Sequence, residues 1–112
     1  MLSLILKLFF YSFGNKKDEF ALLFNELKSI SIIRRSSLFD YAFYYDAYPD
    51  VADSNADGII HYVRQGAAEG RKPNKDFDTT AYVRNNPDIR DYPLNPFVHY
   101  ILHGRKEERK AF

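Results

Sequence analysis

The sequence contains no cysteine and no tryptophan, and it has almost no net charge. Without cysteine the chain cannot form a disulfide, a thiolate nucleophile, or a cysteine-ligated zinc or iron–sulfur site. Its 16 Lys and Arg offset 15 Asp and Glu to leave a net charge of +1. That balance argues against a nucleic-acid-binding protein, which needs a basic surface.

Aromatic residues, in contrast, are abundant. Nine Tyr and ten Phe make up 17% of the 112 residues, while apolar residues in total make up 46% and charged residues 28%. This composition is that of a globular chain, and large aromatic side chains can build a core in a domain of this length.

The second part of the chain consists of two similar halves. Residues 39–74 align with residues 77–112 without a gap, at a spacing of 38, and 12 of the 36 aligned positions are identical. The identical pairs include Tyr44/Tyr82, Pro49/Pro87, His61/His99, Gly66/Gly104 and Arg71/Arg109. Such internal similarity is typical of repeat architectures, so we divide the chain into residues 1–38, a first copy at 39–76 and a second copy at 77–112.

Each copy is predicted to form a pair of short helices. Asp40 and Asp78 stand at predicted N-caps of the first helix, and Asp57 and Asn95 stand at those of the second. Proline follows each first helix and is expected to stop it, and Gly66 and its counterpart Gly104 are expected to act as left-handed C-terminal caps. No stretch alternates with a period of two, so the sequence predicts an all-α fold.

Residues 16–35 are expected to form an amphipathic helix that caps the two repeats. Its predicted apolar face follows helical spacing and comprises Phe20, Leu23, Phe24, Leu27 and Ile30. Two repeats are fewer than the number usually needed to bury a shared core, and an N-terminal cap would supply the missing layer.

The repeated pattern FD-x3-Y-x4-PD, followed by HY-x3-G-x2-E-x-R, resembles a helical repeat of bacterial proteins that synthesise cell-envelope polysaccharides. In that family the copies stand beside glycosyltransferase domains. The second copy departs from the pattern at Asn86 and at Glu108, where the first copy has Tyr48 and Gly70. The resemblance implies a cytoplasmic protein of surface-polysaccharide synthesis, peripheral to the inner membrane, with a glycosyltransferase as its protein partner.

Nothing in the chain resembles a nucleotide-sugar domain, a glycine-rich phosphate loop or a catalytic acidic pair. We therefore expect a non-catalytic interaction or scaffold module without a cofactor. Two alternatives stay open. The chain could be the front end of a glycosyltransferase whose catalytic part lies elsewhere, or a carbohydrate- or calcium-binding module.

Several motifs invite a functional interpretation. Residues 53–58 match the opening of a calcium loop, but Arg64 stands where the closing glutamate should be, so a capped turn is expected. His99 and His103 have a metal-ligand spacing, although the repeated His-Tyr pair favours a buried imidazole bonded to a turn carbonyl. Four aspartates, at positions 40, 46, 50 and 53, are accounted for mainly by caps and turns.

A docking surface for a protein partner is expected at two places. Tyr41 and Tyr45 lie one helical turn apart, on a different face of their helix from Tyr44 and Tyr48. The far side of the second copy has no following repeat to cover it, and the residues proposed there are Phe97, Leu102 and Phe112.

Residues 1–13 are apolar or aromatic at ten positions. As a helix they would span about 20 Å, which is short of the roughly 30 Å hydrocarbon core of a bilayer. A signal peptide is disfavoured because no basic residue precedes the apolar run. The segment is expected either to complete the core or to contact a membrane surface, where Lys7, Lys16 and Lys17 would face anionic lipid.

Overall fold

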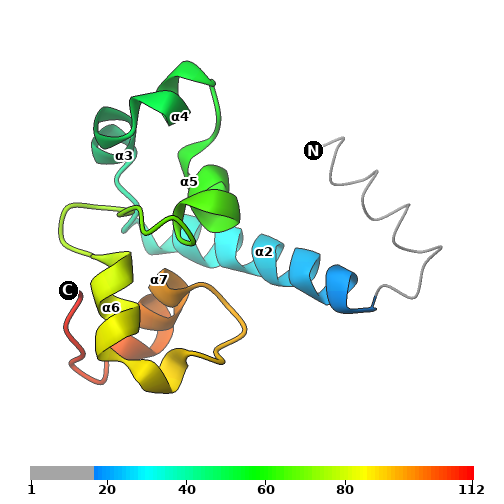
Figure 1. Ribbon diagram of the computed structural model, residues 1–112, viewed down its shortest axis with the longest axis vertical. Helices are drawn as coiled ribbons and strands as arrows, with labels where there is room; N and C mark the ends of the chain where they lie inside the picture. Colours follow the sequence, from blue (N-terminus) through cyan, green and yellow to red (C-terminus); the bar gives the residue numbers. More distant parts are fainter. Residues whose placement is uncertain (1–16) are drawn as a thin grey trace.

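A computed structural model describes residues 17–112 (Figure 1). Within this range every regular element is helical, which confirms the all-α prediction, and the β structure amounts to one isolated bridge between Asn74 and Phe77. The elements in chain order are α2 (Lys17–Ser36), α3 (Tyr41–Ala47), α4 (Pro49–Asp53), α5 (Gly58–His61), η1 (Tyr62–Gly66), α6 (Thr79–Asn85), η2 (Pro87–Ile89), α7 (Pro96–His99) and η3 (Tyr100–Gly104). The interpretations of residues 1–13 concern a segment outside the described residues.

The predicted N-caps are confirmed. The carboxylates of Asp40 and Asp78 each accept a hydrogen bond of 2.9 Å from the backbone N–H three residues later. Asp57 accepts from two amides at the start of α5, and Asn95 accepts from the Phe97 amide at the start of α7. These side chains satisfy amides that a helix leaves without a partner at its beginning.

The prolines end the first helix of each copy, as predicted, and they also begin another one. α3 ends at Ala47 and α6 at Asn85, and Pro49 and Pro87 then open α4 and η2. Proline suits the first position of a helix because the amide it lacks would have no partner there. Each copy therefore contains a short extra turn between the two predicted helices.

Gly66 and Gly104 do not act as left-handed caps, so that prediction was wrong. Both lie at the ends of π-helical turns, η1 and η3, which continue α5 and α7 without a break. The left-handed residues come four positions later, at Gly70 with φ of 76° and at Glu108 with φ of 57°. Glycine is placed there in the first copy because it adopts positive φ without a steric cost.

A different constraint explains Gly66 and Gly104. A Cβ atom added at Gly66 would overlap the hydroxyl oxygen of Tyr44, and one added at Gly104 would overlap that of Tyr82. Each glycine therefore leaves space for the hydroxyl of a tyrosine on the first helix of the same copy.

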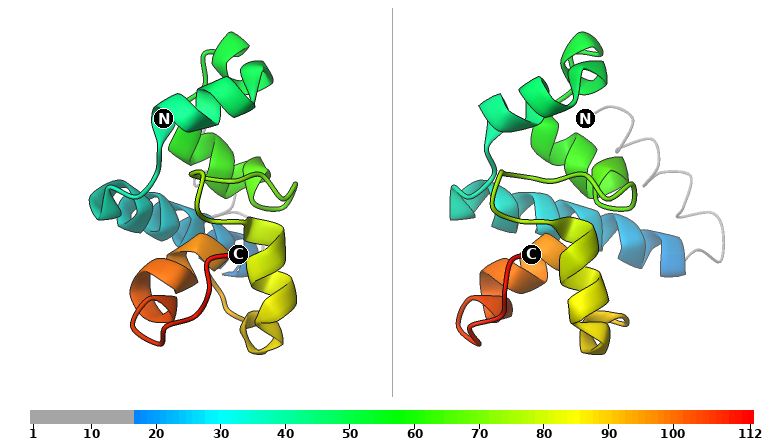
Figure 2. Two further views of the ribbon diagram at one scale, coloured as in Figure 1. Left: turned by 90° about the vertical axis from the view of Figure 1, so that its left-hand side faces the viewer. Right: turned by 60° about the vertical axis from the view of Figure 1, so that its left-hand side comes forward.

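α2 lies between the two copies rather than at the end of the array (Figures 1 and 2). It packs against α5 and η1 of the first copy and against α7 of the second. Leu23, Ile30 and Ile33 of this helix are buried in those contacts. α2 thus covers the second helices of both copies at once. No helix of the described part is long and apolar enough to cross a membrane.

The predicted apolar face of α2 is only partly used. Leu23 and Ile30 are buried, whereas Phe20, Phe24 and Leu27 are exposed. Asn25 and Glu26, in the same part of the helix, contact the second and the first copy, so the exposed residues are those on the side turned away from both copies. The sequence periodicity predicted an apolar stripe, but it could not show which part of that stripe the neighbouring helices would cover.

Aromatic rings join the cores of the two copies. Tyr62 of the first copy packs edge-to-face on Phe97 of the second, and Phe97 packs on Phe77 at 4.8 Å between ring centroids. The Tyr62 hydroxyl lies 2.7 Å from the hydroxyl of Thr79, which itself donates to the Arg71 carbonyl. Because a hydroxyl has one hydrogen, Tyr62 must be the donor to Thr79. All these side chains except Arg71 are buried.

We predict that Gly104→Ala lowers the free energy of unfolding by roughly 1–3 kcal/mol, because the added methyl group meets the Tyr82 hydroxyl. The same substitution should cost less in a Tyr82→Phe background, where that oxygen is gone. Urea unfolding of the two single variants and the double variant measures this coupling. The pair Gly66→Ala and Tyr44→Phe provides a matched cycle in the first copy, and additive effects in both cycles would contradict the explanation.

We also predict that Glu108→Gly stabilises the protein by roughly 1 kcal/mol, since a residue with a Cβ is strained at positive φ. Gly70→Ala at the equivalent position should destabilise it. Thermal unfolding of both variants provides the measurement, with Lys106→Gly as the control for a glycine placed nearby at an exposed position. Destabilisation by Glu108→Gly equal to that by Lys106→Gly would refute the assignment.

Candidate functional site

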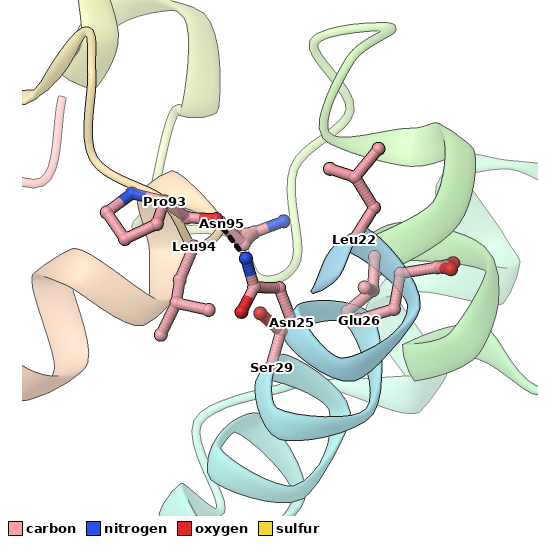
Figure 3. Close-up of a pocket in the computed structure, with 8 residues that line it drawn as sticks. Leu22, Asn25, Glu26, Ser29, Pro93, Leu94 and Asn95 are labelled. Atoms are coloured by element: carbon pink, nitrogen blue, oxygen red, sulfur yellow. Dashed lines mark hydrogen bonds between the residues drawn. The ribbon is translucent and has the colours of Figure 1, made fainter. Parts of the chain in front are cut away.

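A small groove separates α2 from the loop that precedes α7 (Figure 3). Its volume is about 160 Å³. One wall is formed by α2 and the other by the loop at 93–95, and Val63 of η1 also contributes. The residues that line it are Leu22, Asn25, Glu26, Ser29, Val63, Pro93, Leu94 and Asn95.

Two polar contacts hold the walls of the groove in place. The Asn25 side chain reaches across and donates to the Pro93 carbonyl at 3.4 Å (Figure 3). On the other side Arg64 donates to the Glu26 carboxylate at 3.1 Å, with both side chains half-buried. The loop itself is fixed because Asn95 caps α7. The groove is therefore formed by elements of α2 and of both copies.

The chemistry of the groove suits one apolar side chain. Leucine, valine and proline side chains form much of its lining, and Leu22 is 63% exposed at its edge. The amide and carboxylate groups around it can hydrogen-bond a peptide backbone. The volume is below the roughly 300–1,000 Å³ of sites for drug-sized molecules, so the groove does not fit a nucleotide sugar. A second hollow of about 380 Å³ is lined by Asn85, Asn86 and Lys110 and offers no apolar wall.

The residues predicted to dock a partner at the far side of the second copy do not form one surface. Phe97 is fully buried, so its assignment to that surface was wrong. Its ring is enclosed by Phe77 and Tyr62, because the first copy reaches over it. Leu102 is partly buried against the core, and Phe112 is 65% exposed.

Tyr41 and Tyr45 are neighbours on α3, with ring centroids 6.2 Å apart. Tyr41 is exposed. Tyr45 is half-buried, and its hydroxyl donates to the Ala56 carbonyl and accepts from the Gly58 amide. Tyr45 therefore fixes the turn before α5, which leaves Tyr41 as the accessible ring of the pair.

The repeated histidines bind a tyrosine rather than the expected turn carbonyl. Nδ1 of His61 lies 2.8 Å from the Tyr44 hydroxyl, and Nδ1 of His99 lies 2.8 Å from the Tyr82 hydroxyl. In each copy the two residues are 17 positions apart. The bond joins the first helix of the copy to its second helix.

Burial keeps both members of the pair in the second copy uncharged. It raises the pKa of Tyr82 to about 12. Burial, aided by the charges of Arg109 and His103, lowers the pKa of His99 below its usual value. Burial likewise holds the pKa of Tyr44 well above the usual range of tyrosine. Such tyrosines are structural donors or acceptors at neutral pH and are not poised to act as general bases.

The acidic residues are occupied by structural interactions. Asp50 forms two hydrogen bonds of 2.9 Å with the Arg71 guanidinium, and these bonds lower the pKa of its carboxyl. Asp88 is bound by Arg109 in the same way, with the same effect on its pKa. The calcium-like stretch contains Asp57, which caps α5. Among residues 17–112 no group of three His, Asp or Glu side chains is arranged to hold a metal ion.

The second copy has Asn86 where the first copy has Tyr48, and this difference keeps the contacts of the arginine. In the first copy the Arg71 guanidinium lies 4.8 Å from the centre of the Tyr48 ring. In the second copy Asn86 takes that position and accepts a hydrogen bond from Arg109 at 2.9 Å. A polar contact thus replaces a cation–π contact at the same arginine.

Sequence reasoning missed the groove. Leu22 lies outside the predicted apolar stripe of its helix, and Leu94 stands in a turn between two helices. Neither position has a periodic signal. The Tyr–His hydrogen bond did have a signal in the sequence, because tyrosine and histidine stand 17 residues apart in both copies.

Comparisons with models of protein families, with curated proteins and with solved structures gave no match to this chain.

We predict that the protein loses stability as the pH falls from about 7 to about 5. The pKa of His99 is lowered in the folded state, so its contribution is full above the unfolded value of 6.5 and is lost as the pH falls through the folded value. The carboxyls of Asp50 and Asp88 have lowered pKa values and do not titrate in this window.

Melting temperatures measured across this pH range test the assignment to His99. A His99→Asn variant should show a flatter profile, while His103→Asn, which removes one of the charges that lower the pKa of His99, should flatten the profile less. An unchanged slope in His99→Asn would contradict the assignment.

Proposed function

We propose that this chain is a non-catalytic helical interaction module that binds a protein partner in the groove between α2 and the loop at 93–95. The observation that carries the proposal is the groove itself, which has an apolar lining and the exposed Leu22 at its edge. Its size matches one apolar side chain of a partner, held between polar groups that can bind the adjoining backbone. Small apolar pockets of this kind serve as anchor sites in protein interfaces.

The other reactive groups are engaged in structural contacts, which supports a binding role over a catalytic one. Tyr44 and Tyr82 are held by histidines, and Asp50 and Asp88 are held by arginines. These groups stabilise the fold.

The resemblance of the repeats suggests which partner the groove serves. We propose that the partner is a glycosyltransferase of bacterial surface-polysaccharide synthesis and that the two proteins bind in the cytoplasm. The module would present α2 and the two copies as one rigid platform, because the groove draws its walls from all three.

Peptides selected from a displayed library against the full chain provide the test. We expect selected peptides to share an apolar anchor residue and to lose roughly tenfold or more in affinity for Leu22→Asp, because a charge replaces the edge of the groove. The matched control is Phe24→Asp, which changes an equally exposed apolar residue of the same helix outside the groove.

Fluorescence anisotropy of labelled peptides gives the affinities. Equal binding to wild type and Leu22→Asp, or weakening by Phe24→Asp alone, would overturn the proposal. The choice of partner is tested separately, by whether catalytic domains of polysaccharide glycosyltransferases displace a selected peptide. Failure to displace would remove the partner and leave the groove assignment standing.

A further inference from the structure

One side of α2 faces away from both copies and is apolar. It carries Phe20, Phe24 and Leu27, which follow one another at intervals of four and three residues and are 47%, 62% and 40% exposed. The two phenyl rings are stacked, with centroids 6.4 Å apart. We call these three residues the outward face of α2. The buried Leu23 and Ile30 border this face on the side toward the core, and the buried Ile33 lies further round the helix.

The charges of α2 are divided between these two sides. At about 100° per residue, Lys28 and Arg35 share the side of Phe24, about one and about three turns further along the helix, and Arg34 shares the side of Leu27, about two turns further along. Lys28 and Arg35 are exposed, while Arg34 is 3.4 Å from Asp57. The acids at positions 19 and 26 lie toward the core side, where Glu26 is bound by Arg64. The charged residues that border the outward face are therefore cations.

A convex helix face with this pattern fits a flat, anionic, apolar partner. Aromatic and leucine side chains on one face with Lys and Arg along its border are the features of helices that lie in the plane of a membrane surface. The chain that leads into this end of α2, residues 1–13, is itself apolar or aromatic at ten positions.

We propose that the outward face of α2 lies on the surface of an anionic lipid bilayer. Phe20, Phe24 and Leu27 enter the boundary between headgroups and acyl chains, and Lys28 and Arg35 bind lipid phosphates. The helix lies along the membrane. This inference does not depend on the proposed protein partner, because the groove opens on another side of α2, at Leu22 and Asn25.

The absence of tryptophan permits a direct test. In the full chain, Phe24→Trp creates a single reporter on the outward face. We expect its emission to shift to shorter wavelength when vesicles of phosphatidylcholine with phosphatidylglycerol are added, and brominated lipid to quench it. The controls are Leu22→Trp on the groove side and Phe112→Trp at an equally exposed position far along the chain, and neither should respond.

Charge reversal tests the role of the cations. The double variant Lys28→Glu/Arg35→Glu should lose roughly tenfold or more in affinity for these vesicles, and added salt should weaken the wild type in the same way. The matched control is Arg84→Glu/Arg90→Glu, which reverses two exposed arginines of the second copy. Melting temperatures show whether the variants are folded, and little change is expected since all four positions are exposed.

Several outcomes would overturn the proposal. If the chain binds vesicles while the tryptophan of the Phe24→Trp variant keeps its emission, another segment such as residues 1–13 makes the contact. If that tryptophan emits at short wavelength before lipid is added, part of the chain already covers the outward face. Equal binding to phosphatidylcholine alone, or a response to polyglutamate without a response to vesicles, would point to a neutral surface or to an acidic protein.

Discussion

The hydrogen bond between a buried tyrosine hydroxyl and a histidine ring determines how each copy is built. The hydroxyls of Tyr44 and Tyr82 reach the second helix of their copy at 2.8 Å from the Nδ1 atoms of His61 and His99. A buried hydroxyl without a partner would be costly, so the two helices must meet at this distance. The same approach excludes any side chain at Gly66 and Gly104. One polar contact thus accounts for the tyrosine, the histidine and the glycine that are identical in the two copies, and it explains two glycines that carry no unusual backbone conformation.

α2 is the element that turns two similar copies into one body with distinct surfaces. Its buried side packs on α5, η1 and α7, so it contacts both copies. A second side lines the groove with Leu22 and Asn25. The third side, the outward face, is turned away from both copies. Because the three sides belong to one straight helix, a protein held in the groove and a surface held at the outward face would have a fixed orientation to each other.

Much of this fold was predictable from local chemistry. The parts that were not predictable depend on contacts between residues that are far apart in the sequence. The caps at Asp40, Asp57, Asp78 and Asn95 and the helix ends before Pro49 and Pro87 follow from bonds within a few residues, which a sequence displays directly. The role of Gly66 depends on Tyr44, which lies far from it in the sequence, so its local context suggested a cap. Phe97 looked like an uncovered surface residue because the sequence does not show that Tyr62 packs over it. The groove could not be predicted for the same reason, because Leu22 and Leu94 come together only when α2 packs on both copies.

The contact of Tyr62 with the second copy has a consequence for cooperativity. In many repeat proteins each unit has a core of its own, and total stability is a sum of units and of the interfaces between neighbours. Here the Tyr62 ring of the first copy packs on Phe97 of the second. The Tyr62 hydroxyl donates to the hydroxyl of Thr79, which in turn donates to the Arg71 carbonyl. Loosening either copy exposes a polar group and an aromatic ring of the other. Because α2 also packs on both copies, the two copies are expected to unfold in a single step.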